Sequence, residues 1–259
     1  MDRLENLNAI IQGLMANEHV SHRIPFSLHE KQRMMRALMN VWEPQEVSAE
    51  LLAMQDTELL QQAKDKSVVT IDSIAEANSK LSTLNSQLFL WQGDITRLKV
   101  DAIVNAANAQ GLGCWAPLHN CIDNCIHSAA GIQLRKECYD QLQGRLLKTG
   151  EAMITKGYNL PAKHVIHTVG PIIDMDSPTI EQEEQLAQCY RSCIDLAEQA
   201  GLESIAFCCI STGVFHFPNE RAAEIAIETV KRYPRQSVKT VEFNVFLDKD
   251  CEIYERLLG

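Results

Sequence analysis

From about residue 86 to its end, the chain alternates between short apolar runs and longer amphipathic stretches. Several runs are apolar at nearly every position, which is typical of strands buried on both faces of a largely parallel sheet. Strands that alternate with helices predict an α/β fold in which helices cover both faces of the sheet. We expect strands in 86–93, 100–108, 151–158, 163–170, 203–211 and 239–246, and helices in 122–143, 179–201 and 218–233.

Residues 1–85 have a different pattern. They contain a single glycine, Gly13, and no cysteine, and their leucines and methionines recur at helical spacing. We therefore expect a helical N-terminal extension of three or four helices over 1–85, followed by an α/β domain over 86–259. The charge of the extension resembles that of the remainder, so we favour packing against the α/β domain over a separate partner-binding module.

The charge balance limits the partners. The chain has 34 acidic and 24 basic side chains, a formal net charge of −10. Nucleic acids and anionic membranes are bound through an excess of basic residues, so we expect neither as a partner. No apolar run approaches the roughly 18 residues of a membrane span, and the N-terminus has no secretory core, which predicts a cytoplasmic protein. No heptad pattern or apolar stripe requires a second copy, so we expect a monomer.

The nine cysteines are unevenly placed. Their odd number argues against a disulfide framework. None lies in the first 113 residues, and four then follow within 25 positions: Cys114, Cys121, Cys125 and Cys138. The other five lie in apolar segments, where we expect them to pack as small buried hydrophobic residues.

The loop after the second strand of the α/β domain carries a candidate metal site. Cys114, His119 and Cys121 have C-x4-H-x-C spacing, which differs from the paired C-x2-C pattern of structural zinc modules. Three protein ligands with an open fourth position describe a catalytic zinc, whereas four describe a structural one. Cys125 is the candidate fourth ligand, and core packing is its alternative. Asp123 lies in the first turn of the next helix, where capping and an acid–base role are both open.

Two other strand-end loops are candidates for binding. The loop over 211–218 contains one glycine and precedes a helix, so its backbone amides can be directed at a phosphate. The segment 93–96 follows the first strand of the domain. In each case a plain turn is the alternative reading.

Four segments in order resemble the macrodomain family: Gly93–Thr96, Val104–Asn108, Ile122–Gly131 and Ser211–Phe215. The resemblance covers 86–259 and implies a three-layer α-β-α fold with a mixed, largely parallel sheet. Ordinary macrodomains have a polyglycine stretch between the second and third segments, where this chain has Cys114–Cys121. This departure, with the helical extension, is similar to the zinc-dependent microbial macrodomains. Those are protein-ADP-ribose hydrolases associated with a sirtuin-type ADP-ribosyltransferase and lipoyl carrier proteins.

The resemblance also implies roles for individual residues. The zinc ligands would be Cys114, His119 and Cys121, with one zinc ion per chain. Asp123 falls at the catalytic aspartate of many zinc-free members, and Asn108 would hold the distal ribose beside it. The ADP-ribose contacts would be Asp94 and Ile95 at the adenine, Asn105, Asn108, Ile122, Asp123 and Asn124 around the ribose, and Ser211, Thr212, Gly213, Val214 and Phe215 at the diphosphate and distal ribose.

The expected activity is zinc-dependent removal of mono-ADP-ribose from acidic side chains of a modified protein, with release of ADP-ribose. The resemblance points to a lipoyl carrier protein as that substrate. Two alternatives stay open: a non-catalytic ADP-ribose-binding module, and an O-acetyl-ADP-ribose deacetylase.

Overall fold

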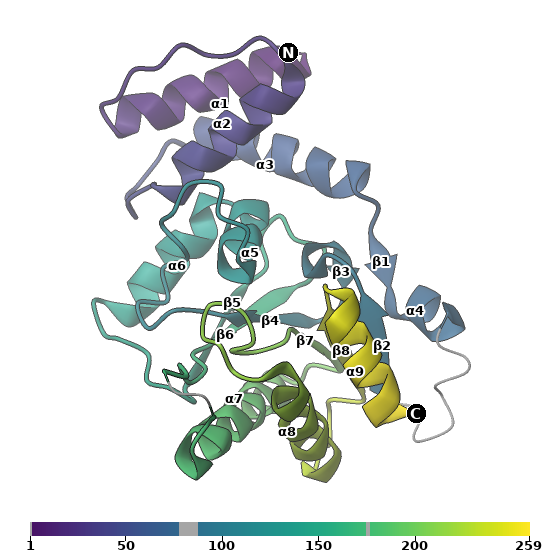
Figure 1. Cartoon of the computed structure of the whole chain (residues 1–259). Helices are drawn as coiled ribbons and strands as arrows, with labels where there is room; N and C mark the ends of the chain where they lie inside the picture. Colours follow the sequence, from purple (N-terminus) through teal and green to yellow (C-terminus); the bar gives the residue numbers. More distant parts are fainter. Residues whose placement is uncertain (1, 78–87, 175–176) are drawn as a thin grey trace.

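The computed structural model describes residues 2–77, 88–174 and 177–259, and its central feature is a six-stranded sheet (Figure 1). The strand order is β2-β8-β7-β4-β6-β5, and every neighbouring pair is parallel except β5 with β6. The mixed, largely parallel sheet is therefore confirmed. Its strands are β2 (Leu88–Gln92), β4 (Ala102–Ala106), β5 (Ala152–Lys156), β6 (His164–Thr168), β7 (Ser204–Phe207) and β8 (Thr240–Val245).

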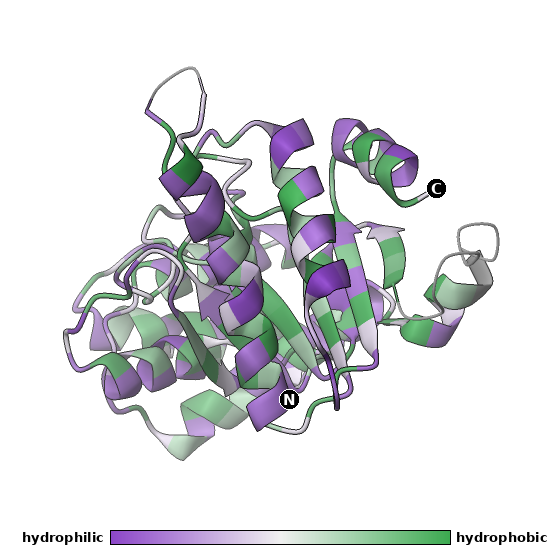
Figure 2. Cartoon of the chain, turned by 90° about the horizontal axis from the view of Figure 1, so that it is seen from below, coloured by the Kyte–Doolittle hydropathy of each residue, from purple (hydrophilic) through white to green (hydrophobic). Residues whose placement is uncertain are grey.

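Helices cover both faces of this sheet, which confirms the three-layer arrangement. One face is covered by α5 (Ile122–Ala130) and α6 (Ile132–Leu142), and the other by α7 (Ile180–Gln199), α8 (Asn219–Arg232) and α9 (Asp248–Leu258). Figure 2 shows that the strands carry mostly hydrophobic residues, whereas the helices alternate between hydrophobic and hydrophilic positions. The apolar helix faces are thus buried against the sheet.

The helices differ from the expectation at two places. The helix expected over 122–143 is divided at Gly131, whose φ of 103° belongs to the left-handed half of backbone space that favours glycine. Helix α9 was not expected from the sequence, and it packs on the edge strand β2 and on its neighbour β8.

The N-terminal part forms a layer of three helices stacked outside α5 and α6 (Figure 1). These are α1 (Arg3–Asn17), α2 (Leu28–Asn40) and α3 (Ala49–Asp65). They enclose a second hydrophobic core, which includes Leu7, Ile10 and Trp42 and reaches Ile132 of α6. The extension therefore packs against the α/β domain, as favoured from the sequence.

A short connection joins the helical layer to the sheet. It consists of β1 (Val69–Thr70) and α4 (Ile71–Ala77), and β1 pairs in parallel with β3 (Leu98–Lys99). Ile74 of α4 belongs to the core of the α/β domain. The expected domain boundary at 85/86 lies outside the described residues.

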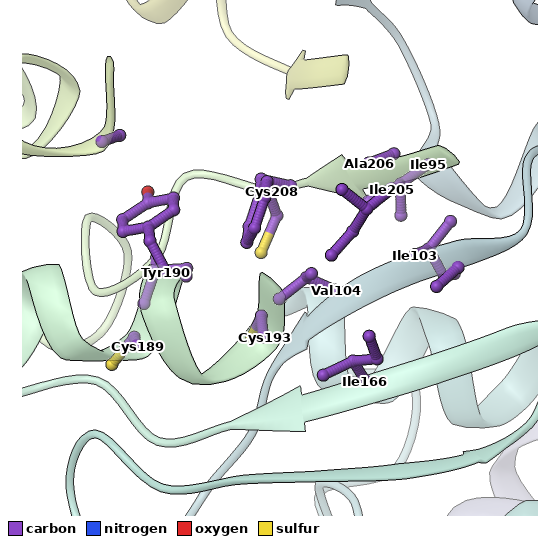
Figure 3. Close-up of a cluster of buried hydrophobic side chains, with 14 of the residues drawn as sticks. Ile95, Ile103, Val104, Ile166, Cys189, Tyr190, Cys193, Ile205, Ala206 and Cys208 are labelled. Atoms are coloured by element: carbon purple, nitrogen blue, oxygen red, sulfur yellow. The ribbon is translucent and has the colours of Figure 1, made fainter. Parts of the chain in front are cut away.

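The six cysteines that follow residue 125 pack in the core or at its margin. Cys189, Cys193 and Cys208 lie among the apolar side chains between α7 and the sheet (Figure 3). Cys138 is buried as well, while Cys209 and Cys251 are partly exposed and pack at the margin of the same core. All nine cysteines are free thiols. None of the described helices is both long and apolar enough to span a membrane.

Candidate functional site

The carboxyl ends of the parallel strands meet at one edge of the sheet, where the candidate loops lie. Backbone hydrogen bonds join neighbouring loops at this edge. The Ile173 N–H after β6 donates to the Phe215 carbonyl oxygen after β7 at 2.9 Å. The Ala107 N–H after β4 donates to the Thr168 carbonyl oxygen at 2.9 Å. The fold therefore brings the loops after β4, β6 and β7 into one site.

The three expected metal ligands converge. Cys114, His119 and Cys121 each place a ligand atom within 4.8 Å of the others, and Cys114 Sγ lies 3.7 Å from His119 Nδ1. Cys121 is the N-cap of α5, and its Sγ accepts a hydrogen bond from the Asn124 N–H at 3.4 Å. His119 is exposed and both thiols are partly exposed, so the group opens to solvent.

Cys125 does not join this group. It lies one turn into α5, and its Sγ faces the Arg36 guanidinium at 3.8 Å. A cation beside this thiol is a different environment from that of a metal ligand. Of the two arrangements left open by the sequence, the geometry thus favours three protein ligands over four.

The electrostatics of the two loop thiols fit a bound cation. Burial raises the pKa of the Cys121 thiol to about 12, and the neighbouring Cys114 adds to this increase, against a hydrogen bond from the Asn124 N–H. Two adjacent thiolates are therefore unfavourable on their own. A divalent metal removes this penalty because a coordinated thiol is deprotonated. The donor set of two sulfurs and one imidazole nitrogen is one that zinc prefers.

Asp123 lies in the first turn of α5, two residues after Cys121, and is only 5% exposed. Its Oδ1 accepts a hydrogen bond from Asn105 Nδ2 at 2.7 Å, and its Oδ2 accepts from Asn108 Nδ2 at 3.4 Å. Burial raises the pKa of Asp123 to about 6, against the Asn105 hydrogen bond and the charge of Arg135. Two side-chain amides, one from the end of β4 and one from the loop that follows it, thus contact both oxygens of a buried carboxylate.

Two buried histidines support this carboxylate from the core. His167 lies 3.1 Å from Asn105 Nδ2 through Nδ1 and 3.0 Å from Thr155 Oγ1 through Nε2. His127 Nε2 lies 3.6 Å from Asp123 Oδ1. Burial lowers the pKa of His167 to about 3 and that of His127 well below its usual value. Both rings are therefore neutral and serve as polar packing groups.

These histidines also form a second group with a metal-like arrangement. The ligand atoms of His127, Cys138 and His167 lie within 4.8 Å of one another. All three side chains are buried, and both nitrogens of His167 are already within hydrogen-bonding distance of Asn105 and Thr155. We therefore assign this group to the support of Asp123.

Asp94 lies in the loop after β2, where it caps a short 3-10 turn, η1 (Ile95–Arg97). Its Oδ1 accepts from the Thr96 N–H at 3.0 Å and from Thr96 Oγ1 at 2.6 Å. Its Oδ2 accepts from Lys66 Nζ at 3.1 Å. Burial alone would raise the pKa of Asp94, but Thr96 and the Lys66 charge hold it below its usual value. Asp94 is thus an anionic acceptor, and the adjacent Ile95 is buried.

The loop after β7 leads into α8. Ser211 is buried and has a φ of 66°, while Gly213 and Val214 are exposed. The Phe217 N–H donates to the Ser211 carbonyl oxygen at 2.9 Å, which closes the loop on itself. Within the described residues, no hydrogen bond uses the N–H groups of Gly213, Val214 and Phe215. These amides are available to an anion, as expected for this loop.

The remaining residues of the expected site lie at the same edge. Asn124 is fully buried, and Ile122 begins α5 beside Asp123. Thr212 is partly buried, and its Oγ1 donates to the Cys209 carbonyl oxygen at 3.0 Å. The fold therefore brings the residues expected to contact the adenine, the diphosphate, the ribose and the metal together around the strand ends.

Several residues at this site were not expected from the sequence. Phe246 directly follows β8 and is 71% exposed, and its carbonyl oxygen accepts from Gln92 Nε2 at 3.3 Å. Ligands of parallel sheets bind beyond the carboxyl ends of the strands. The position of Phe246 directly after a strand would therefore have identified it, because an exposed aromatic side chain there is available to stack on a ligand ring. Arg36, Asn40 and Lys66 come from the helical extension, and no local pattern marks them.

Comparisons with known proteins agree with this arrangement. The sequence profile described as Macro domain matches residues 104–226. A curated protein named protein-ADP-ribose hydrolase from Treponema medium is 47% identical over 241 residues, which cover 92% of this chain and 91% of that protein. A mutant macrodomain of Oceanobacillus iheyensis, solved with ADPR, is 39% identical with a TM-score of 0.61, over 68% of this chain and 94% of its own. The Trypanosoma brucei macrodomain in complex with ADP-ribose is 29% identical with a TM-score of 0.65, over 91% and 97%.

Proposed function

The chain belongs to the macrodomain family, and on that premise we propose that it is a zinc-dependent protein-ADP-ribose hydrolase. The macrodomain fold expected from the four ordered segments is confirmed. The observation that carries the proposal is the convergence of Cys114, His119 and Cys121 at the N-terminus of α5, the helix whose first turn contains Asp123. The proposed zinc and a buried carboxylate would then lie together at the end of the sheet where the nucleotide would bind.

Cys114, His119 and Cys121 would hold the zinc. Zinc–sulfur and zinc–nitrogen bonds of about 2.0–2.3 Å separate tetrahedral ligand atoms by roughly 3.3–3.8 Å. The distance of 3.7 Å between Cys114 Sγ and His119 Nδ1 agrees with this range. When bound, zinc would supply a Lewis acid at an oxygen of the distal ribose or at a water molecule.

Each of the strand-end loops would contact a different group of ADP-ribose. Asp94 would accept a hydrogen bond from the adenine amino group, next to the backbone of Ile95. The free amides of Gly213, Val214 and Phe215 would bind the diphosphate, with Ser211 and Thr212 fixing the start of that loop. Backbone amides need no basic side chain, which reconciles an anionic ligand with a chain of net charge −10.

Asp123 and Asn108 would act at the reacting ribose. The Asp123 carboxylate, fixed by Asn105 and Asn108, would orient a ribose hydroxyl or the attacking water. Ile122 and Asn124 would shape the same side of the ribose. The bond that breaks joins C1″ of the distal ribose to an acidic side chain, and water supplies the hydroxyl of the released ADP-ribose.

The substrate is proposed from the family resemblance to be a lipoyl carrier protein modified on an aspartate or glutamate. No described contact identifies this partner. The monomeric state and the cytoplasmic location expected from the sequence also stay predictions.

The test combines metal analysis with release of ADP-ribose from a mono-ADP-ribosylated protein. We expect about one zinc per chain, loss of release after chelation, and recovery when zinc is added back. Equal rates for the chelated and zinc-loaded protein would refute zinc dependence. Binding of ADP-ribose without any release would favour the non-catalytic module, and faster cleavage of O-acetyl-ADP-ribose than of the modified protein would favour the deacetylase.

A further inference from the structure

Helix α2 of the N-terminal extension contacts the candidate metal loop, which we define as residues 114–121. Arg36 Nη2 donates to the carbonyl oxygen of His119 at 2.7 Å and to Asn124 Oδ1 at 2.8 Å. Arg36 Nε also donates to Asn124 Oδ1, at 3.3 Å. One guanidinium thus fixes the backbone of a metal ligand and a buried side chain under the loop.

Asn40 makes a second contact, one turn further along α2. This side chain is 1% exposed, and its Oδ1 accepts a hydrogen bond from the Leu118 N–H at 2.9 Å. Leu118 has a φ of 60°, in the left-handed region that a leucine rarely adopts. The strained residue next to His119 is therefore held in place by an amide from α2.

Asn124 connects the two contacts to the rest of the metal loop. Its Nδ2 donates to the carbonyl oxygens of Ala116 at 2.9 Å and Cys114 at 3.5 Å. Its Oδ1 accepts from Ser128 Oγ at 3.2 Å, and Ser128 Oγ in turn accepts from Asn40 Nδ2 at 3.0 Å. The backbone at residues 114, 116, 118 and 119 is thus held by α2 or by a side chain that α2 holds.

Arg135 of α6 ties the end of α2 to the same loop. Its Nη1 donates to the carbonyl oxygens of Met39, Asn40 and Trp42 at 2.8–3.2 Å. Its guanidinium also lies 4.1 Å from the ring centroid of Trp115. The position of α2 is therefore linked to the conformation of the metal loop both by side chains of α2 itself and by Arg135 of α6.

From these contacts we propose that Arg36 and Asn40 are positioning residues of the metal site. They hold the metal loop in the conformation in which its three ligand atoms converge, so the site is completed by the N-terminal extension. This inference rests on the proposed function to the extent that the loop binds zinc. Partners that orient metal ligands commonly change metal affinity by about 10–100-fold when they are removed.

The experiment measures zinc dissociation constants of the full-length protein by competition with a chromophoric chelator. We expect Arg36→Met and Asn40→Leu each to weaken zinc binding by about tenfold or more. Arg33→Met is the matched control, because Arg33 is an exposed arginine on the same helix and should leave the constant unchanged. Binding of ADP, which lacks the distal ribose, should be unchanged in all three variants.

Two conservative variants separate positioning from simple attachment of the helix. Arg36→Lys keeps the charge but loses the forked geometry, so we expect an intermediate zinc affinity. Asn40→Asp keeps the acceptor for the Leu118 N–H, so we expect it to weaken zinc less than Asn40→Leu. Circular dichroism and ADP binding identify the variants that fold, and a wild-type zinc constant in every folded variant would overturn the inference. Wild-type protein that binds no zinc would instead refute the proposed function.

Discussion

Two loops of the site are held in different ways. The loop over 211–215 is closed by its own backbone, through the bond from the Phe217 N–H to Ser211, and leads directly into α8. The metal loop depends on side chains from α2 that lie about 80 residues away in sequence. The loop proposed to bind phosphate is thus held within the α/β domain, whereas the loop proposed to bind metal is held by both regions of the chain.

The largest expected effect comes from a substitution that should impair the metal loop and leave the 211–215 loop intact. Cys121→Ala removes one of three ligands, so we expect zinc affinity and ADP-ribose release each to fall by at least about 100-fold. ADP affinity should change by less than about threefold, because the amides that would hold the diphosphate are elsewhere. Metal analysis, a release assay and calorimetry measure the three quantities. Retained zinc in this variant would remove Cys121 from the ligand set.

A substitution at Gly170 should have the opposite result, impairing the 211–215 loop and leaving the metal loop intact. A Cβ atom at this position would lie 2.0 Å from Ser211 Oγ and 2.9 Å from Ile210 Cγ2, so Gly170→Ala displaces the start of the 211–215 loop. Because the displaced loop carries the amides that would bind the diphosphate, we expect ADP affinity to fall by about 30-fold, or about 2 kcal/mol of binding free energy. Zinc content should stay at the wild-type level. A parallel loss of zinc would show that the two loops are not independent.

Asp94→Ala tests the adenine end with a smaller change. Loss of one charged acceptor is expected to weaken ADP binding by about tenfold, because such hydrogen bonds contribute roughly 1.5 kcal/mol. Lys66→Met is the companion variant, since it removes only the partner of Asp94 Oδ2. Titration calorimetry with ADP should give a smaller change for Lys66→Met. A larger effect from Lys66 would make the lysine, and not the carboxylate, the principal adenine-side group.

The last prediction concerns the core of the sheet, and its measured quantity is folding stability instead of ligand affinity. Glu242 of β8 is fully buried, its two oxygens have no hydrogen-bond partner within the described residues, and burial raises its pKa to about 9. A carboxyl with a raised pKa is stabilised when neutral, so the fold loses stability as the pH rises from the unfolded value of about 4.5 toward 9. We expect Glu242→Gln to be more stable than wild type by about 1–3 kcal/mol at pH 7, and equal to it near pH 4. Urea unfolding across this range measures the difference, and a constant gap at all pH values would contradict it.

Much of the fold follows from local pattern. Apolar runs identified all six strands of the main sheet, and the positions of the loops after the strands marked those with Cys114 and Ser211 as candidates for binding. These features depend on residues that are close in sequence. The division of the helix at Gly131 could not be predicted from the sequence, because a glycine is also tolerated within one continuous helix. It is evident only from the backbone angle of Gly131 in the structure.

The contacts from the helical extension could not be predicted in this way. Arg36 and Asn40 occupy ordinary positions on an amphipathic helix, and their partners at His119 and Leu118 follow in a distant loop. Lys66 likewise reaches Asp94 only because β1 pairs with β3. A single sequence contains no periodic signal for pairs of this kind.

The attachment of α2 to the metal loop has a reciprocal consequence. If α2 increases the affinity of the loop for zinc by a given factor, then zinc must stabilise the docked position of α2 by the same factor, because the two equilibria form a thermodynamic cycle. Bound zinc would then stabilise the association between the helical extension and the α/β domain. Amide hydrogen exchange in α2 would slow on zinc loading, and the helical extension would report the metal content of an active site that it does not itself contain.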